Sequence, residues 1–421
     1  MKKLLTTMMV IGTVAWAFAG DFPVDGDGAA IQKAIDRAAA AGGGRVVVAP
    51  GVHPSGSLVL KSHVELHLSE GAVILGSTKL EDYADFPKDV CSVSPECSYK
   101  VLLQAWDAED IAVTGKGMID GRGPAFYPVK PPRGHWPKPK TCRPIMVQFV
   151  RCKGVRLEGV TFKDSALWTM FIRLCENIAV DGITVVGDQR MINNDGIDFD
   201  ACKHVRVGNS RFRTGDDCLI LRSMRETPEE RVVCEDVVVS NCVLNSTCQT
   251  IRMGCSSDDV IRNAKFLNIK ASGMNGIFFD YPARYLRPYD EGFQDISDIL
   301  FDGYEGEFTG SPVQIVVEPG VKIRGVRDVT FRNFKVKGRR QLRFVGNHDS
   351  VLKNITVENL TAEVAAGRKD YDAAATEPLV FRNTTINGKR IADGELVTPR
   401  GKRLPLKRRN GGSWETLRQK K

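Results

Sequence analysis

Four stretches of the sequence share one pattern that decides the fold: GVRLEGVTF at 154–162, NIAVDGITV at 177–185, HVRVGNSRF at 204–212 and DVVVSNCVL at 236–244. In each, apolar residues alternate with polar ones, a small residue or Asn follows, and the alternation resumes. Their starts lie 23, 27 and 32 residues apart. Recurrence at this interval is typical of a repeat architecture. Looser copies begin at Asp298, Asp328 and Lys353.

A unit of this length cannot bury its own apolar face, so copies must stack on one another. Short strands with β-branched residues and Gly or Asn turns favour an all-β solenoid. A β-sandwich is the alternative, but it would pair its strands through hairpins, and Asn-Gly hairpin signals are few. We expect one solenoid domain over residues 20–394.

One helix is expected before the strands begin. Residues 29–41 place Ile31, Ala34, Ile35 and Ala38 on one face, and three glycines follow at 42–44. An exposed edge of a sheet needs a cover. We therefore predict that this helix caps the N-terminal end of the solenoid.

The net charge of +8 on 421 residues is concentrated at the ends of the chain. Residues 395–421 carry nine basic and two acidic side chains, whereas residues 20–394 are close to neutral. The basic residues therefore form a tail and no groove, so we expect no nucleic-acid partner. The tail is expected to be solvated; an anchor to an anionic polymer or membrane surface is the alternative.

Residues 1–19 have the features of a cleavable signal peptide. Lys2 and Lys3 precede an apolar stretch at 4–18, and Ala17-Phe18-Ala19 is a small-x-small cleavage pattern. No later stretch is long and apolar enough to cross a bilayer. We expect a secreted or periplasmic protein that starts near Gly20 and is a monomer.

Eleven cysteines in such a chain suggest disulfides, and Cys91 with Cys97 in one polar loop is the best candidate pair. Seven others, from Cys175 to Cys255, lie among strand-like segments, where Cys can serve as a small core residue. The chain has no CxxC pair and its six His are scattered. We therefore expect no metal site.

Three carboxylates are candidates for catalysis. Asp195 lies 21 and 22 residues before Asp216 and Asp217, which is close to one repeat. On consecutive coils they would be about 4.7–4.9 Å apart in the stacking direction. Close acids cannot all ionise freely, so one should hold a proton and the others should not, as glycosidic bond cleavage requires. Turn formation and calcium binding are alternative interpretations of such acids.

NNDGIDFDAC at 193–202 and TGDDCLILRS at 214–223 resemble the signature of glycoside hydrolase family 28, the polygalacturonases and their relatives. Further similarity lies at 30–53, 58–77, 110–123 and 163–180, and it extends over roughly residues 22–395. The resemblance implies a right-handed parallel β-helix and inverting hydrolysis of an α-linked, pectin-like polysaccharide without a cofactor. By motif, Asp216 would be the general acid, Asp195 and Asp217 would activate water, and Asn193 or Asn194 would help hold the site.

The sequence departs from the family pattern at two places. CQTIRMGC at 248–255 has Gln249 where the family has a His that supports the acid. GIFFDYPARY at 276–285 has Phe278 and Asp280 in place of an Arg-x-Lys that binds substrate carboxylate. A carboxylate there would repel a uronate. The substrate-binding candidates are Asn193, Asn194, Gln249, Asp280, Tyr281, Arg222 and Arg252. Each Arg also fits a solvated outer position, and Trp168 and Tyr281 also fit simple packing.

Two other classes of function stay open. A polysaccharide lyase on the same fold would need a uronate, usually a calcium ion, and a Lys or Arg base. A non-catalytic carbohydrate-binding solenoid would keep the acids without using them, and the missing His makes this conceivable.

Overall fold

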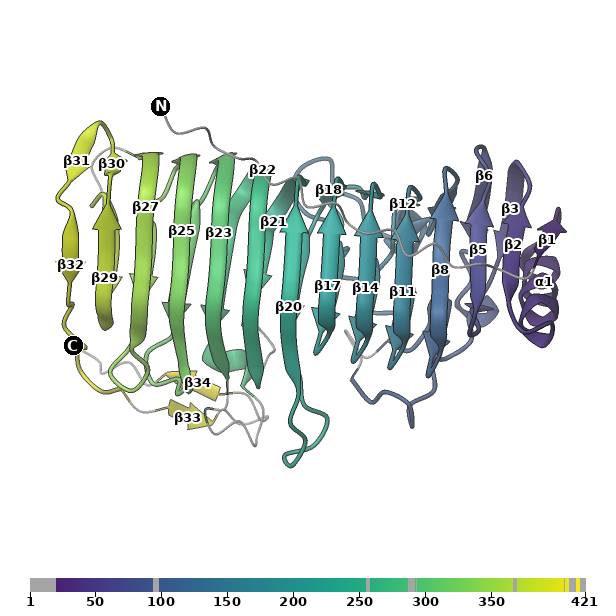
Figure 1. Ribbon diagram of the computed structural model, residues 1–421, viewed down its shortest axis with the longest axis horizontal. Helices are drawn as coiled ribbons and strands as arrows, with labels where there is room; N and C mark the ends of the chain where they lie inside the picture. The colour runs from purple at the N-terminus through teal and green to yellow at the C-terminus, as the bar shows by residue number, and fades with distance from the viewer. Residues whose placement is uncertain are drawn as a thin grey trace.

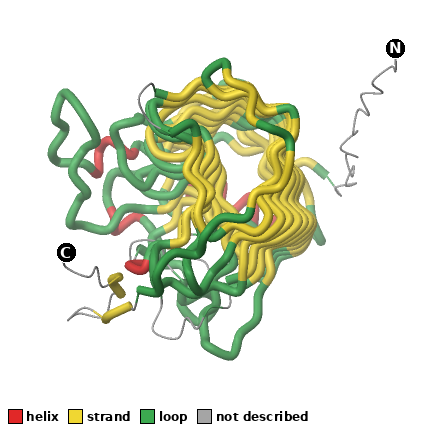
Figure 2. The backbone as a smooth tube through the Cα atoms, turned by 90° about the vertical axis from the view of Figure 1, so that its left-hand side faces the viewer, coloured by secondary structure: helices red, strands yellow, loops and turns green. Residues whose placement is uncertain are grey.

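The computed structural model describes residues 20–93, 98–254, 258–286, 292, 294–365 and 369–404, and the backbone of 406–408 and 414–416. The chain winds into a parallel β-helix whose strands succeed one another along the long axis (Figure 1). Seen along that axis, the strands superpose into walls around a common interior (Figure 2). Residues 1–19, the expected signal peptide, lie outside the described residues.

The strands form three parallel ladders. The first consists of β2 (Gly44–Val48), β5 (Val64–Leu68), β8 (Glu109–Gly115), β11 (Lys153–Glu158), β14 (Glu176–Asp181), β17 (Lys203–Gly208), β20 (Val233–Ser240), β22 (Val260–Tyr281), β23 (Asp295–Phe308), β25 (Gly325–Gly338), β27 (Leu352–Val364) and β29 (Thr376–Arg382). The second consists of β3 (Gly51–Ser55), β6 (Ala72–Gly76), β9 (Met118–Asp120), β12 (Thr161–Lys163), β15 (Thr184–Val186), β18 (Arg211–Thr214) and β21 (Val243–Met253), followed by the middle parts of the long strands and β30 (Thr384–Ile386).

The third ladder carries the candidate site. It consists of β4 (Leu58–Val59), β7 (Val101–Trp106), β10 (Ile145–Val150), β13 (Met170–Arg173), β16 (Ile197–Asp200), β19 (Leu219–Arg222), the ends of β21 and β22, β24 (Val313–Val317), β26 (Leu342–Val345) and β28 (Tyr371–Ala374). The other described strands are β1 (Asp21–Val24), which pairs with β2, and the C-terminal strands β31 (Lys389–Ile391), β32 (Gly394–Leu396), β33 (Leu406–Arg408) and β34 (Trp414–Thr416). Short 3-10 helices also occur among the described residues. The 3-10 helices are η1 (Leu80–Asp82), η3 (Gly123–Phe126) and η4 (Ala283–Tyr285).

The small residue inside each repeat forms a corner between the first and second ladders. Gly159, Gly182, Asn209 and Asn241 occupy this position in successive coils with φ between 52° and 76°. Only Gly and Asn adopt this left-handed region readily. Neighbouring corner Asn side chains also bond to one another, with Asn241 Nδ2 donating to Asn209 Oδ1 at 3.4 Å and Asn268 Nδ2 to Asn241 Oδ1 at 2.7 Å. The sequence repeat is therefore the coil repeat.

The inward residues stack in columns along the interior. Phe266, Phe301 and Phe331 occupy one position of the first ladder in three consecutive coils, with ring centroids 4.8 and 5.3 Å apart. Cys152, Cys175, Cys202 and Cys234 are buried in four successive coils. Cys175, Cys202 and Cys234 are thus core residues, as the sequence suggested, and Cys152 is a core residue as well. Cys97 of the expected Cys91–Cys97 disulfide lies outside the described residues.

Helix α1 (Gly28–Ala40) covers the N-terminal end of the stack (Figure 1). Asp27 caps it by accepting a hydrogen bond from Ala30 N at 3.1 Å. Ile31, Ala34, Ile35 and Ala38 are buried, as predicted. Among the described residues, no helix is long and apolar enough to cross a membrane.

The first part of the expected basic tail packs on the last coils. β32 pairs antiparallel with β29, and Thr398 Oγ1 accepts a hydrogen bond from Thr376 N at 2.8 Å. Arg403 binds the Asp349 carboxylate, with Nη2 2.6 Å from Oδ1. Residues 395–404 thus contribute contacts to the solenoid, which the sequence did not indicate.

Candidate active site

The three candidate acids lie together on the outer side of the third ladder. Asp195 directly precedes β16, and Asp216 and Asp217 precede β19, one coil further on. The backbone stacks these two positions, because Gly196 N donates to Asp217 O at 2.8 Å. Arg252 at the end of β21 and Asp280 at the end of β22 follow on the next two coils. The parallel stack therefore brings together residues up to 85 positions apart in the sequence.

Two glycines allow the coils to approach at this point. A Cβ on Gly196 would lie 2.2 Å from Cys218 O, and one on Gly215 would lie 2.0 Å from Met191 O. Both distances are far below contact between non-bonded atoms. These glycines are therefore required by close backbone approach.

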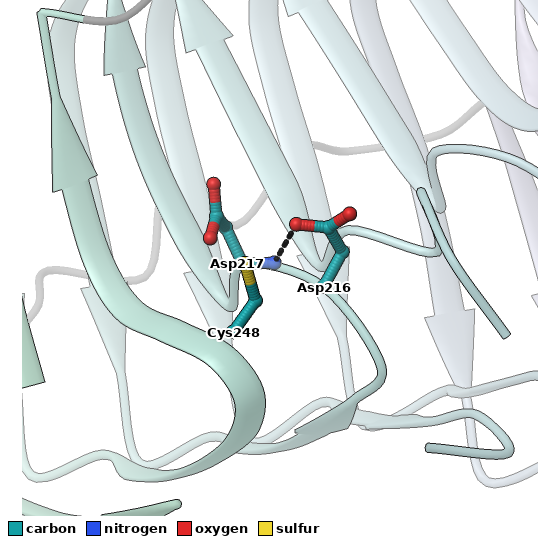
Figure 3. A group of neighbouring side chains, drawn as sticks. All are labelled: Asp216, Asp217 and Cys248. Carbon is teal, nitrogen blue, oxygen red and sulfur yellow. Dashed lines mark hydrogen bonds between the residues drawn. The ribbon is translucent and has the colours of Figure 1, made fainter. Parts of the chain in front are cut away.

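Asp216 is the most accessible of the three acids. Its Oδ2 accepts a hydrogen bond from Asn193 N and its Oδ1 one from Asp217 N, both at 3.0 Å. Figure 3 shows its carboxylate beside the carboxylate of Asp217 and the thiol of Cys248. One oxygen from each carboxylate and the Cys248 sulfur lie within 4.8 Å of one another. Burial and the neighbouring Asp217 raise the pKa of Asp216 above its ordinary value, although the Asn193 N–H opposes this. Asp216 is therefore disposed to hold a proton.

Asp217 is anchored as a carboxylate. Its Oδ2 accepts a hydrogen bond from Arg252 Nη1 at 2.9 Å, and its Oδ1 one from Gln249 N at 3.1 Å. Arg252 also lies between Asp217 and Asp280, with Nη2 3.6 Å from Asp280 Oδ2. Burial raises the pKa of Asp280, and Arg252 opposes that shift. Arg252 is thus engaged by two carboxylates on its two sides.

Asp195 is buried, and its Oδ1 has no hydrogen-bond partner among the described residues. Arg222 Nη2 is 3.9 Å from its Oδ2. Burial and the negative charges of Asp216, Asp198 and Asp217 raise the pKa of Asp195 well above its ordinary value. A buried carboxyl with one unbonded oxygen next to two other acids is suited to hold or share a proton.

Arg222 is a buried ion-pair residue, contrary to the solvated position considered from sequence. Its Nε donates to Asp198 Oδ1 at 2.6 Å, and its guanidinium lies 4.5 Å from the centroid of the Trp168 ring. Burial raises the pKa of Asp198 to about 7, even though Arg222 opposes the shift. Arg222 and Trp168 therefore form a floor next to Asp195.

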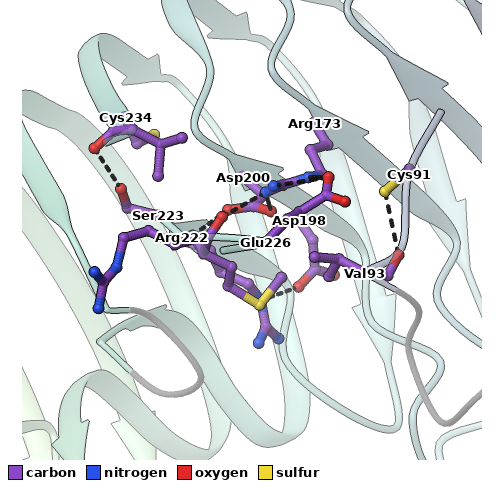
Figure 4. A network of polar contacts seen from close by, with 12 residues as sticks. Cys91, Val93, Arg173, Asp198, Asp200, Arg222, Ser223, Glu226 and Cys234 are labelled. Atoms are coloured by element: carbon purple, nitrogen blue, oxygen red, sulfur yellow. Dashed lines mark hydrogen bonds and ion pairs between the residues drawn. The ribbon is translucent and has the colours of Figure 1, made fainter. Parts of the chain in front are cut away.

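A second buried ion pair continues this floor. Arg173 and Asp200 are both fully buried and bonded to each other, and Arg173 also contacts Glu226 (Figure 4). Glu226 accepts hydrogen bonds from the backbone and side chain of Ser92. Asp198 and Asp200 alternate with the inward Ile197 and Phe199 and so point outward. They are nevertheless fully buried, because loops from residues 90–93 and 224–231 cover this part of the ladder.

Asn193 and Asn194 support the site from its back. Asn193 Oδ1 accepts from Arg143 Nη2 at 3.1 Å, while the Asn193 N–H holds Asp216. Asn194 is buried, and its Oδ1 accepts from Gly215 N at 2.8 Å. These contacts fit the expectation that Asn193 or Asn194 helps hold the site, and their contact with substrate stays a prediction. Arg143, buried and far away in sequence, was missed because nothing in its local sequence marks it.

Tyr281 does not lie where the sequence predicted a substrate-binding residue. It is 4% exposed and packs in the interior core, since odd-numbered residues at the end of β22 point inward and Phe278 and Asp280 point outward. It cannot reach a substrate. Gln249 does lie at the site: it is mostly buried, and its Oε1 accepts from the Cys248 thiol at 2.7 Å. Cys248 was missed as a site residue, although it directly precedes Gln249.

Comparisons with known proteins agree with this arrangement. The sequence model of "Glycosyl hydrolases family 28" matches residues 92–235, which include the three acids. A "Probable polygalacturonase" of Vitis vinifera is 29% identical over 192 residues, covering 43% of this chain and 37% of that protein. An "Exopolygalacturonase clone GBGE184" of Arabidopsis thaliana is 27% identical over 249 residues, covering 52% and 58%. The chain therefore aligns with roughly a third to three fifths of the length of these curated relatives.

The fold agrees over a longer part of the chain. The crystal structure of an exopolygalacturonase from Thermotoga maritima superposes with a TM-score of 0.68 and 23% identity, covering 89% of this chain and 94% of that one. The right-handed parallel β-helix predicted from the sequence is thereby confirmed. Residues 92–235 thus match glycoside hydrolase family 28, and the chain is similar to polygalacturonases in sequence and in fold.

Proposed function

We propose that the chain is a glycoside hydrolase that cleaves an α-linked, pectin-like polysaccharide with inversion at the anomeric carbon. The observation that carries this is the cluster of Asp195, Asp216 and Asp217 on consecutive coils, with the raised pKa of the accessible Asp216. Family membership of the region that holds these acids supports it.

The proposed reaction assigns a role to each acid. Asp216 gives its proton to the glycosidic oxygen as the bond between that oxygen and the anomeric carbon breaks. A water molecule attacks from the opposite face and transfers a proton to a carboxylate. Asp217, which is bonded to Arg252, is the proposed acceptor, and Asp195 orients the water. No cofactor is required, because water and carboxylates account for every proton and bond.

The contacts of Arg252 with Asp217 and Asp280 limit which sugars can bind at the cleavage point. A uronate next to the scissile bond needs a cation that is free to bind it. Arg252 is already bonded to Asp217 and lies beside Asp280, and Asp280 would repel a uronate. We therefore propose little activity on unbranched polygalacturonate. A neutral sugar, or an acidic glycan whose charge lies away from the cleaved linkage, is the proposed substrate.

The experiment is incubation of the protein with polygalacturonate and with neutral and branched pectic oligosaccharides at matched concentration. Released sugars are quantified, and proton NMR of the first product reports its anomer. The inverted anomer from a neutral or branched oligosaccharide is expected. The retained anomer would refute the mechanism, and efficient cleavage of polygalacturonate would refute the proposed substrate. An unsaturated product would instead indicate a lyase, for which the ion-paired Arg222 and Arg252 are poor bases.

We further propose that residues 1–19 are a signal peptide, that residues 20–394 form the catalytic domain and that residues 395–421 form a basic C-terminal extension of a secreted or periplasmic monomer. N-terminal sequencing of the exported protein tests the first point, with Gly20 as the expected first residue. Light scattering of the purified protein tests the oligomeric state.

A further inference from the structure

A polar cavity lies on the same outer face as the acids, further toward the C-terminus. Its volume is about 270 Å³, and it is lined by Ser311, Gln314, Arg340, Gln341, Arg343 and Asp372. The strand register connects it to the site: Ile220, Arg252, Phe278, Gln314, Arg343 and Asp372 occupy one position of the third ladder in successive coils.

A second row of polar residues leads from the acids to this cavity. Asp217 is followed on the next coils by Gln249, Asn275 and Ser311, since Cys218 N donates to Gln249 O, Gln249 pairs with Asn275, and Gly276 N donates to Ser311 O. With about 4.8 Å between coils, Arg343 lies about 19 Å from the coil of the acids. A polysaccharide lying along the ladder would reach the cavity several sugar units away from the cleaved bond.

The charges of the cavity favour a single anion. Arg343 donates to Gln314 Oε1 at 3.4 Å, and its Nε lies 3.5 Å from Asp372 Oδ2, so this acid offsets one cation. Arg340 is exposed and has no carboxylate within ion-pair distance among the described residues. The two Arg and one Asp that line the cavity thus give it a net charge of +1. Gln314, Gln341 and Ser311 add neutral groups of the kind that bind sugar hydroxyls.

We infer that this cavity is a subsite for an acidic sugar residue, with Arg340 and Arg343 binding its carboxylate and the glutamines binding its hydroxyls. The inference rests on the proposed function, because it takes the ligand to be part of the polysaccharide that the acids cleave. It would allow the chain to select an acidic glycan although Arg252, at the cleavage point, is already bonded to Asp217. The guanidinium fork of Arg suits a carboxylate geometrically.

Binding is tested separately from catalysis with two probes, a galacturonate hexamer and its methyl ester, which differ only in charge. Calorimetry with the protein and with Arg340→Gln and Arg343→Gln measures affinity. Lys335→Gln is the matched control, since Lys335 loses the same charge but lies 77% exposed on β25, away from the third ladder. The acid is expected to bind about tenfold more tightly than the ester, and each Arg variant should remove most of this difference, the scale of one charge-assisted hydrogen bond.

Equal binding of acid and ester, absence of binding, or the same loss in Lys335→Gln would overturn the subsite. Hydrolysis is measured in parallel with branched acidic oligosaccharides, where the Arg variants should raise KM and leave kcat unchanged. Acid-selective binding by a protein that cleaves none of the glycans would leave the subsite intact and refute the proposed hydrolase activity. Cleavage of the glycans without acid-selective binding would refute the subsite and leave the proposed hydrolase activity intact.

Discussion

At the scale of single residues, the site is defined by how each charge is partnered. Asp217 and Asp198 each have an Arg, Asp216 has two backbone N–H groups, and Asp195 has one oxygen without a partner among the described residues. Burial raises the pKa of Asp195, Asp198 and Asp216, and the partners of each acid modify that shift. An acid that keeps its proton near neutral pH is what the general-acid role requires.

The first prediction concerns Asp216. Asp216→Asn removes the proton donor and keeps the volume, so activity should fall about 10²- to 10⁴-fold while the fold is retained. Hydrolysis rates and circular dichroism measure the two effects. Asp298→Asn is the control, because Asp298 is an exposed carboxylate on the first ladder. A rate near that of the unmodified protein in Asp216→Asn would disprove the assignment.

Sequence predicted the three acids because one rule suffices for them: residues one repeat apart lie on adjacent coils. It also contained the information that Tyr281 points inward, since Tyr281 follows outward Asp280 in an alternating strand. It did not reveal the burial of Asp198 and Asp200. Their burial depends on loops from residues 90–93 and 224–231, and strand alternation does not tell how a distant loop covers an outer face.

At the scale of elements, the corner asparagines link each coil to the next. Asn241 combines a left-handed backbone, with φ of 54°, with side-chain bonds to Asn209 and Asn268. The backbone conformation and the side-chain bonds are separate contributions. They can be distinguished by two substitutions at one position.

Asn241→Ala loses both contributions, whereas Asn241→Gly loses only the side-chain bonds. The Ala variant should therefore be less stable than the Gly variant by about 1 kcal/mol, the lower end of the cost of a left-handed conformation for a residue with a Cβ. Urea denaturation monitored by fluorescence measures the difference. Equal stability of the two variants would show that the backbone at this corner relaxes without cost.

The C-terminal segment separates into a docked part and the remainder. Removal of residues 405–421 should change the melting temperature little, because β33 and β34 pair with each other and β34 lies against the short helix η4, whereas residues 394–404 pair with β29 and bond to Thr376 and Asp349. Removal of 394–421 should lower it by several degrees, since β29 loses its partner strand and Thr376 loses Thr398. Scanning calorimetry of both truncations tests this. A large drop with the shorter truncation would place further contacts beyond residue 404.

At the scale of the whole molecule, the buried acids make stability depend on pH. The pKa values of Asp195, Asp198 and Asp216 are raised in the folded state, that of Asp198 to about 7. Between about pH 4 and pH 7 the folded protein therefore binds more protons than the unfolded chain, and its free energy of unfolding falls as the pH rises. Acids with lowered pKa, such as Asp107, Asp236 and Asp349, act in the opposite direction only at lower pH.

We therefore predict a higher melting temperature at pH 5 than at pH 7. Asp198→Asn should reduce this difference, because its amide cannot titrate. Differential scanning calorimetry across this range, in buffers of equal ionic strength, measures both. A melting temperature that rises steadily from pH 5 to pH 7 in the unmodified protein would contradict the raised pKa values.

The parallel register of the third ladder has a consequence for how specificity changes over evolution. Contact positions on the outer face of the third ladder are spaced in whole coils, each about 4.8 Å from the next. Insertion or loss of a complete coil between two contact positions would change their separation by the spacing of one coil and preserve the direction of every side chain. Insertion of a single residue within a strand would instead turn outward residues inward. Lineages of such proteins are thus free to adjust the length of polymer they measure in discrete steps, while the coils that hold the acids stay unchanged.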